Sequence, residues 1–95
     1  MEAQLVLRVK KVKQGLIIEL VIWKLTAPFP GCTHCFKYRL FCGSLETGIG
    51  LVRYDNERGK GDHKHVGVVE LPYTFIGLET LVADFEKDVR EVLQK

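Results

Sequence analysis

Apolar and polar residues alternate along most of the first 70 positions, which is the pattern of half-buried β-strands. The alternation is found in five segments, at residues 4–12, 16–25, 35–42, 49–55 and 63–70. Three of the four links between them are short and contain glycine, at residues 13–15, 43–48 and 57–62. Short links join neighbouring antiparallel strands, so we predict a meander.

The pattern changes after the Leu-Pro-Tyr segment at residues 71–73. Apolar residues then recur at helical spacing from Leu78 to Val92, which predicts an amphipathic helix over residues 78–94. Gly77 is an acceptable N-cap, and Glu79 in the first turn suits the helix dipole. The expected fold class is therefore α+β, with an antiparallel sheet of about five strands and one C-terminal helix packed on one face.

Alternation also assigns the strand residues to two faces. The face that the helix is expected to cover carries Leu5, Leu7, Ile18, Leu20, Ile22, Tyr38, Leu40, Val52, Tyr54, Val66 and Val68. The opposite face, which we call the open face, is expected to carry Arg8, Lys10, Glu19, Trp23, Lys37, Arg39, Arg53, Asp55, His63 and His65.

Length and composition fit one globular domain over residues 1–95, with 46% hydrophobic and 27% charged residues. So short a chain buries only roughly 60–65% of its unfolded surface, so a partner chain or a homodimer would supplement its stability. No apolar run reaches the ~18–20 residues that span a bilayer, and the N-terminus does not resemble a signal peptide. We expect a cytoplasmic protein with no membrane contact.

Charge is distributed unevenly along the chain. Residues 1–65 hold eleven Lys/Arg against six Asp/Glu, a balance of +5, whereas residues 66–95 hold three against six, a balance of −3. This asymmetry fits a basic working surface with a more acidic closing element.

The densest chemistry lies in the segment RYDNERGKGDHKH at residues 53–65. His63 and His65 share a strand face about 6.5–7 Å apart, so they can act as the base and the acid of a metal-independent ribonuclease. Asp55 or Asp62 can orient a histidine. The cations placed to stabilise phosphate are Lys37, Arg39, Arg53, Lys60 and Lys64. Trp23 on the same open face can stack a base or contact a partner.

Two plainer interpretations stay open for these residues. The histidines can cap a tight turn and bond to Asp62 or to the backbone, and the His-x-His pair is also a ligand geometry for zinc. Cys32, His34 and Cys35 can complete such a site, but a lone C-x-x-C lacks a second pair, so we expect no metal and no cofactor. Three cysteines are too few for a disulfide scaffold, and Cys42 is expected in the core.

The chain resembles a known family at four places. They are Tyr38-Arg39-Leu40-Phe41, the run from Tyr54 to His65, Pro72-Tyr73-Thr74-Phe75, and Leu78 to Phe85. Together these resemble the TumE family of toxins, and the resemblance covers nearly the whole chain. It implies the toxin half of a type II toxin–antitoxin pair, with a small antitoxin that carries a helix-turn-helix DNA-binding domain. RNA cleavage is expected by analogy with other small sheet-plus-helix toxins.

Two functional hypotheses follow. In the first, the protein is a ribonuclease toxin silenced by an antitoxin that covers the basic face. In the second, it is a non-catalytic toxin or interaction module, zinc-stabilised in one form, that blocks a cellular target by binding through Trp23 and the arginines.

Overall fold

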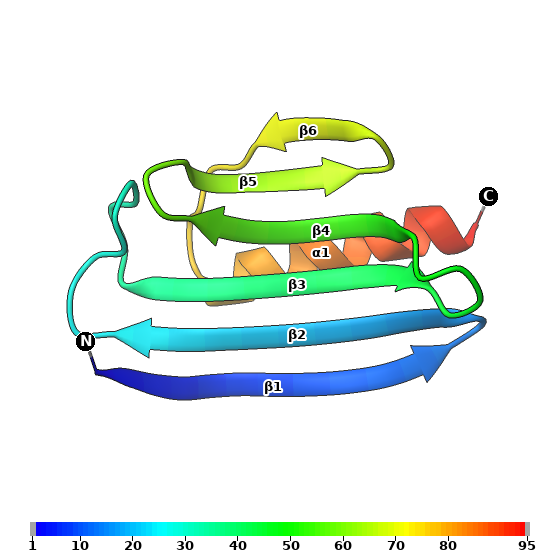
Figure 1. Ribbon diagram of the computed structural model, residues 1–95, viewed down its shortest axis with the longest axis horizontal. Helices are drawn as coiled ribbons and strands as arrows, with labels where there is room; N and C mark the ends of the chain where they lie inside the picture. Colours follow the sequence, from blue (N-terminus) through cyan, green and yellow to red (C-terminus); the bar gives the residue numbers. More distant parts are fainter. Residues whose placement is uncertain (1, 95) are drawn as a thin grey trace.

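The computed structural model describes residues 2–94. It contains one six-stranded antiparallel sheet in the order β1-β2-β3-β4-β5-β6, with one helix across one face (Figure 1). The elements are β1 (Ala3–Lys13), β2 (Leu16–Leu25), β3 (Phe36–Ser44), β4 (Gly50–Glu57), β5 (Gly61–Val66), β6 (Val69–Pro72) and α1 (Leu78–Leu93). The α+β prediction is confirmed, and every strand pairs with its neighbours in the sequence.

The core lies between α1 and the middle of the sheet. The helix begins after Gly77 as predicted, and it buries Leu81, Phe85 and Val89 against the strands. Tyr54 of β4 packs edge-on against Phe85, with ring centroids 5.8 Å apart. The sheet contributes a continuous buried set of Ile18, Leu20, Ile22, Tyr38, Leu40, Cys42, Val52 and Tyr54. Cys42 is thus a core residue, as expected.

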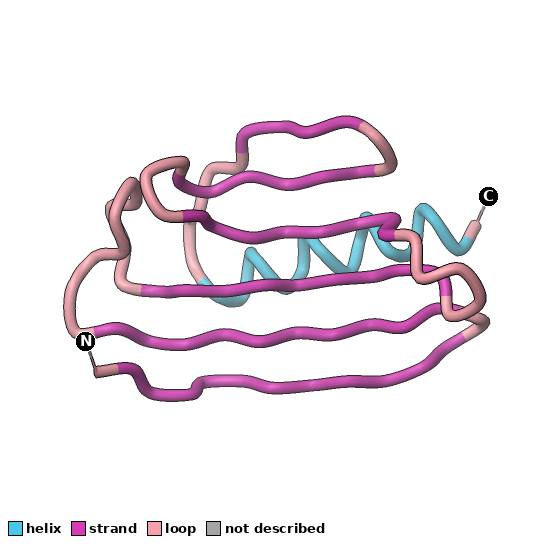
Figure 2. Tube along the Cα trace, viewed as in Figure 1, coloured by secondary structure: helices cyan, strands magenta, loops and turns pink. Residues whose placement is uncertain are grey.

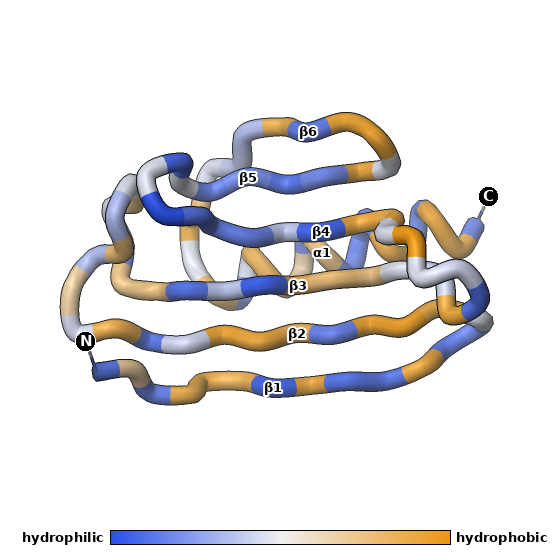
Figure 3. Tube along the Cα trace, in the orientation of Figure 1, coloured by the Kyte–Doolittle hydropathy of each residue, from blue (hydrophilic) through white to orange (hydrophobic). Residues whose placement is uncertain are grey.

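Hydropathy differs from strand to strand. Figure 3 shows β2 as largely hydrophobic, whereas β5 and the adjacent end of β4 are hydrophilic along most of their length. The apolar half of the meander supports the core, and the polar half carries the 53–65 segment. The fold therefore places most of the predicted site residues on β3, β4 and β5.

The fifth predicted strand, residues 63–70, is wrong as one element. It is a hairpin of β5 and β6 joined at Gly67 and Val68, with Gly67 at φ 62°. Positive φ at the first of two loop residues is the type II′ requirement, and glycine meets it without strain. Val68 is consequently fully exposed instead of covered by the helix.

Leu5 is the second misassigned position. A β-bulge between Leu5 and Leu7 shifts the register, so Leu7 faces Ile22 on the helix side while Leu5 pairs with Trp23. An extra residue in one strand reverses the alternation beyond it. Leu5 is 44% exposed for this reason.

The long loop between β2 and β3, residues 26–35, packs beside the turn between β4 and β5 (Figure 2). The Gly59 N–H donates to the Pro30 carbonyl at 2.8 Å. Gly31, at φ 92°, lies so close to Gly59 that a Cβ there would be 2.9 Å from the Gly59 carbonyl carbon. The close backbone contact fixes the loop against the start of β5. No helix among residues 2–94 is long and apolar enough to cross a bilayer.

Candidate functional site

Two cross-strand rows bring the predicted residues together on the open face. Directly paired residues of antiparallel strands share a face. The register pairs Arg39 with Asp55 and Asp55 with His63 in one row. In the next row it pairs Phe41 with Arg53, Arg53 with His65, and His65 with Glu70. We call Arg39, Arg53, Asp55, His63 and His65 the open-face cluster.

His63 is the buried member of the pair, with 3% exposure. Its Nδ1 lies 3.1 Å from the Gly61 carbonyl oxygen, which can only accept, so Nδ1 carries a proton. Its Nε2 faces two carboxylates, 2.5 Å from Asp55 Oδ1 and 3.4 Å from Glu57 Oε1. Nε2 and Oδ1 are buried and close but not aligned as a hydrogen bond. A lone pair on Nε2 would repel both carboxylates, so these contacts are favourable only when Nε2 carries a proton.

His65 faces a hydrogen-bond donor instead of carboxylates. Arg53 Nη2 lies 2.8 Å from His65 Nε2, and a guanidinium can only donate. Nε2 of His65 is therefore an unprotonated acceptor, and the ring proton is on Nδ1. The two imidazoles lie edge to face with centroids 5.3 Å apart. Arg53 Nε also lies 3.2 Å from Asp55 Oδ2. Arg53 therefore contacts His65 directly and is connected to His63 through Asp55.

A surface depression lies beside β6 and is lined in part by His63. Lys60, Asp62, Glu70, Leu71 and Pro72 line it together with His63. The Lys60 ammonium and the Glu70 carboxylate form an ion pair at this depression. Their hydrogen bond raises the pKa of Lys60 and lowers the pKa of Glu70. Both side chains are exposed, so the pair is weak and can open.

The remaining predicted cations of the open face differ in how they are engaged. Lys37 Nζ donates to the Asn56 carbonyl at 2.5 Å and lies 5.2 Å from the Phe29 ring. Arg39 is exposed, and its guanidinium lies 4.7 Å from the Phe41 ring. Among the described residues Arg39 has no acidic ion-pair partner, so its charge is available to a ligand. Trp23 lies on the same face, with Arg8 5.9 Å from its ring.

Asp62 and Lys64 belong to the other face. They pair with Asn56 and Tyr54, whose side chains point toward the helix. Lys64 Nζ donates to Asp88 of α1 at 3.2 Å and to the Tyr54 hydroxyl at 3.3 Å. The structure therefore directs the Asp62 and Lys64 side chains away from the two histidines, and Asp55 and Glu57 are the carboxylates that face His63.

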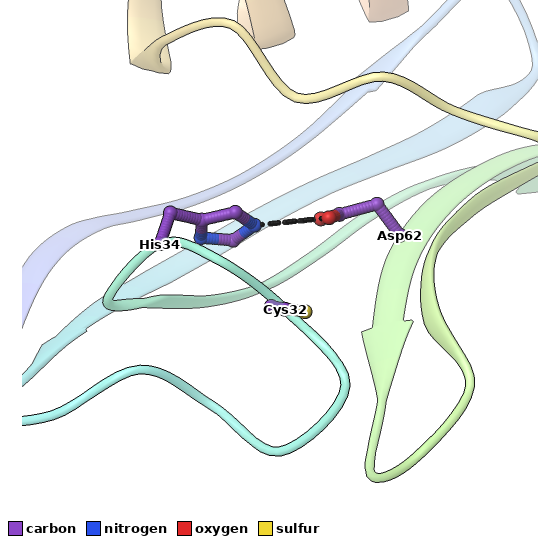
Figure 4. Close-up of side chains that lie close together, drawn as sticks. All are labelled: Cys32, His34 and Asp62. Atoms are coloured by element: carbon purple, nitrogen blue, oxygen red, sulfur yellow. Dashed lines mark hydrogen bonds and ion pairs between the residues drawn. The ribbon is translucent and has the colours of Figure 1, made fainter.

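Asp62 instead forms a second cluster, with Cys32 and His34 of the 26–35 loop (Figure 4). His34 Nε2 donates to Asp62 Oδ1 at 2.8 Å, and the Tyr38 hydroxyl donates to the same oxygen at 2.6 Å. His34 Nδ1 accepts the Phe36 N–H at 3.2 Å, which fixes the proton on Nε2. Burial and then the Asp62 contact raise the pKa of Tyr38.

These hydrogen bonds bear on metal binding. Cys32, His34 and Asp62 have ligand types that suit zinc, and their ligand atoms lie within 4.8 Å of one another. A metal on His34 Nε2 would displace the proton to Nδ1, where the Phe36 N–H already donates. Burial and the Asp62 charge also raise the pKa of Cys32, which disfavours the thiolate that zinc needs. The hydrogen bonds of this cluster therefore favour a structural role, in which His34 holds the 26–35 loop against Asp62 of β5, over a metal site.

Asp55, His63 and His65 form the other group with metal-ligand spacing, again with ligand atoms within 4.8 Å of one another. Arg53 contacts two of the three side chains. Its positive charge opposes a divalent ion at the same place.

Comparison with protein families matches residues 2–93 to the family described as Toxin TumE. The chain belongs to the TumE toxin family. Comparison with curated proteins and with solved structures found no significant match. The family implies a type II toxin–antitoxin system, and hence an antitoxin partner for this TumE family toxin.

Sequence reasoning missed three features of this TumE site. Alternating valines around Gly67 predict one continuous strand that includes Glu70. The structure instead has a turn at Gly67, which places Glu70 opposite His65 on the neighbouring strand. Asn56 is wholly buried although it stands in a run of charged residues. The contact between His34 and Asp62 spans 28 residues and has no local signal.

Proposed function

We propose that this TumE family toxin cleaves RNA at the open-face cluster by metal-independent acid–base chemistry. The observation that carries the proposal is that two neighbouring histidines have opposite surroundings, one facing acceptors and the other facing a donor. Carboxylates and a carbonyl surround His63, whereas Arg53 donates to His65. Cleavage through the 2′-hydroxyl requires one base and one acid close to the same phosphate.

His65 is the proposed base. Its Nε2 lone pair is engaged by Arg53 in the free protein. A phosphate that binds Arg53 draws the guanidinium away and releases the lone pair. His65 then takes the 2′-hydroxyl proton while the 2′-oxygen forms a bond to phosphorus. Arg53 remains on the phosphate and stabilises its developing charge.

His63 is the proposed acid. As the P–O5′ bond breaks, the 5′-oxygen takes the proton from His63 Nε2, which leaves a 5′-hydroxyl and a 2′,3′-cyclic phosphate. The leaving oxygen reaches the ring through the depression at Lys60 and Glu70 after their ion pair opens. Asp55 holds the imidazolium before the transfer.

The rest of the open face supplies binding. Arg39 has a free guanidinium next to the Asp55 row and is the proposed anchor for a flanking phosphate. Lys37 adds a second positive charge, and Trp23 offers a ring on which an unpaired base can stack. Family resemblance favours a cytoplasmic toxin and an antitoxin with a helix-turn-helix domain.

Substitution of each histidine tests the proposal. His65→Ala and His63→Ala are each expected to lower the cleavage rate by about 10²–10⁴-fold and to abolish growth arrest, since each removes one proton-transfer group. Lys87→Ala, on the exposed side of α1, is the matched surface control and stays toxic. Circular dichroism confirms folding of each variant. Full toxicity in both folded histidine variants would refute the mechanism.

A non-catalytic toxin is the second candidate, and one observation favours it. His63 is almost fully buried, and Asp55, Arg53, Lys60 and Glu70 are paired with one another or with the histidines. Such internal pairing also stabilises a docking surface. This candidate predicts growth arrest without RNA cleavage, and a toxic His65→Ala variant.

A further inference from the structure

The two edges of the sheet are unequal. β6, at one edge, has four residues and ends at Pro72, which has no N–H to offer a further strand. β1, at the other edge, has eleven residues, and all but Leu7 and Val9 are exposed. A long edge strand with an unpaired row of backbone groups is a template for another strand.

An apolar groove accompanies β1 on the helix side. The helix α1 packs over the middle of the sheet and leaves a depression whose lining includes Val6, Leu7, Ile22, Leu78, Val82 and Ala83. A second depression continues along the helix past Glu86, which lines both, to Leu93. We call the two together the β1 groove.

Charge along the groove is asymmetric. Lys11 and Lys13 lie on the helix side of β1, opposite Ile18 and Leu16, and line the far end with Arg90. Glu79 lines the near end, where α1 begins. A second copy of this chain would bring its own three lysines, Lys10, Lys11 and Lys13, to the same edge. An acidic segment would neutralise them instead.

We propose that the antitoxin of this TumE family toxin anchors on the β1 groove through an extended segment that adds a seventh strand to β1. Alternate apolar side chains of that segment enter the groove beside Val82, and acidic side chains meet Lys11, Lys13 and Arg90. Backbone pairing gives affinity, and the groove and the lysines give specificity. The site lies on the helix side, away from the open-face cluster, and does not depend on RNA cleavage.

Hydrogen exchange of the wild-type toxin, alone and with its cognate antitoxin, tests the site. β1 amides that point away from β2 are expected to exchange at least tenfold more slowly in the complex, since they gain hydrogen bonds. Protection confined to the β4–β5 segment, with β1 unchanged, would overturn the proposal. If β1 is also protected in concentrated toxin alone, and the toxin then has the mass of a dimer, the edge belongs to a second copy of the chain. That result would overturn the proposal as well.

A charge reversal gives an independent readout. Lys11→Glu is expected to weaken binding of the purified antitoxin by about 10- to 100-fold in calorimetry, because a favourable charge pair becomes repulsive. Lys87→Glu makes the same change on the other flank of α1, where it lines the cleft with Tyr54, and should leave the Kd unchanged. Equal Kd values for the two folded variants would contradict the proposed contact.

Discussion

Asn56 is expected to be the most sensitive polar position near the open-face cluster. Cross-strand pairing between β3 and β4 ends at Arg39 and Asp55, although β3 begins at Phe36. Beyond that pair, the side-chain amide of Asn56 makes the hydrogen bonds to β3 that a backbone partner would otherwise make. Its Oδ1 accepts the Tyr38 N–H at 3.1 Å, and its Nδ2 donates to the Phe36 carbonyl at 2.7 Å.

Asn56→Ala would leave both backbone groups without a partner. Asn56 is wholly buried and Tyr38 is 1% exposed, so water does not easily replace the lost amide. Each buried unpaired group costs about 1–3 kcal/mol. The loss should therefore be about 2–6 kcal/mol, a large part of the roughly 5–14 kcal/mol that stabilises a domain of this length.

Urea denaturation followed by circular dichroism measures this loss. With a slope of about 1–1.5 kcal/mol per molar urea, the midpoint should fall by at least about 1.3 M. Asn56→Asp is the informative control. It keeps an acceptor for Tyr38 but sets a carboxylate against the Phe36 carbonyl, so it should be at least as destabilising. A loss below about 1 kcal/mol in Asn56→Ala would show that the side-chain amide does not extend the sheet.

Two further predictions concern the loop and the buried tyrosines. Gly31→Ala should lower the melting temperature by roughly 8 °C or more, because the new Cβ would meet the Gly59 backbone. Gly48→Ala is the control, since Gly48 also has positive φ but lies in open space, and it should lower the melting temperature by about half as much. Equal shifts in the two variants would mean that the close contact is unimportant. Burial raises the pKa of Tyr38 above the value near 10 of an unfolded chain, so its stabilising contribution is complete below pH 10 and is lost as pH rises further. Unfolding free energy measured from pH 8 to 11 should fall less steeply in Tyr38→Phe than in the wild type, and parallel curves would exclude this source of alkaline sensitivity.

The sequence predicts the fold well because local signals agree with the packing. Alternation on both sides of Gly15 predicts the first hairpin, and the stripe from Leu78 predicts the helix. Prediction failed where one residue changes the register. The bulge that exposes Leu5 and the turn at Gly67 each shift the residues beyond them to another face or strand.

The candidate site was predictable in part for the same reason. The row that joins Asp55 to His63 follows from strand alternation and a short turn. Placement of Asp62 depends on contacts with His34 and Tyr38 from a distant loop, which no period in the sequence encodes. The contacts of His63 with Asp55 and of His65 with Arg53 depend on the register of three strands, so residue types alone could not predict them.

The most direct test of RNA cleavage uses purified toxin, one defined RNA and excess EDTA, with the product ends identified. The account predicts cleavage that EDTA does not inhibit and fragments that end in 2′,3′-cyclic phosphate and 5′-hydroxyl, lost in His65→Ala. Intact RNA, from a preparation that arrests growth when expressed in cells, would contradict the acid–base account. Cleavage that requires added metal would contradict it too.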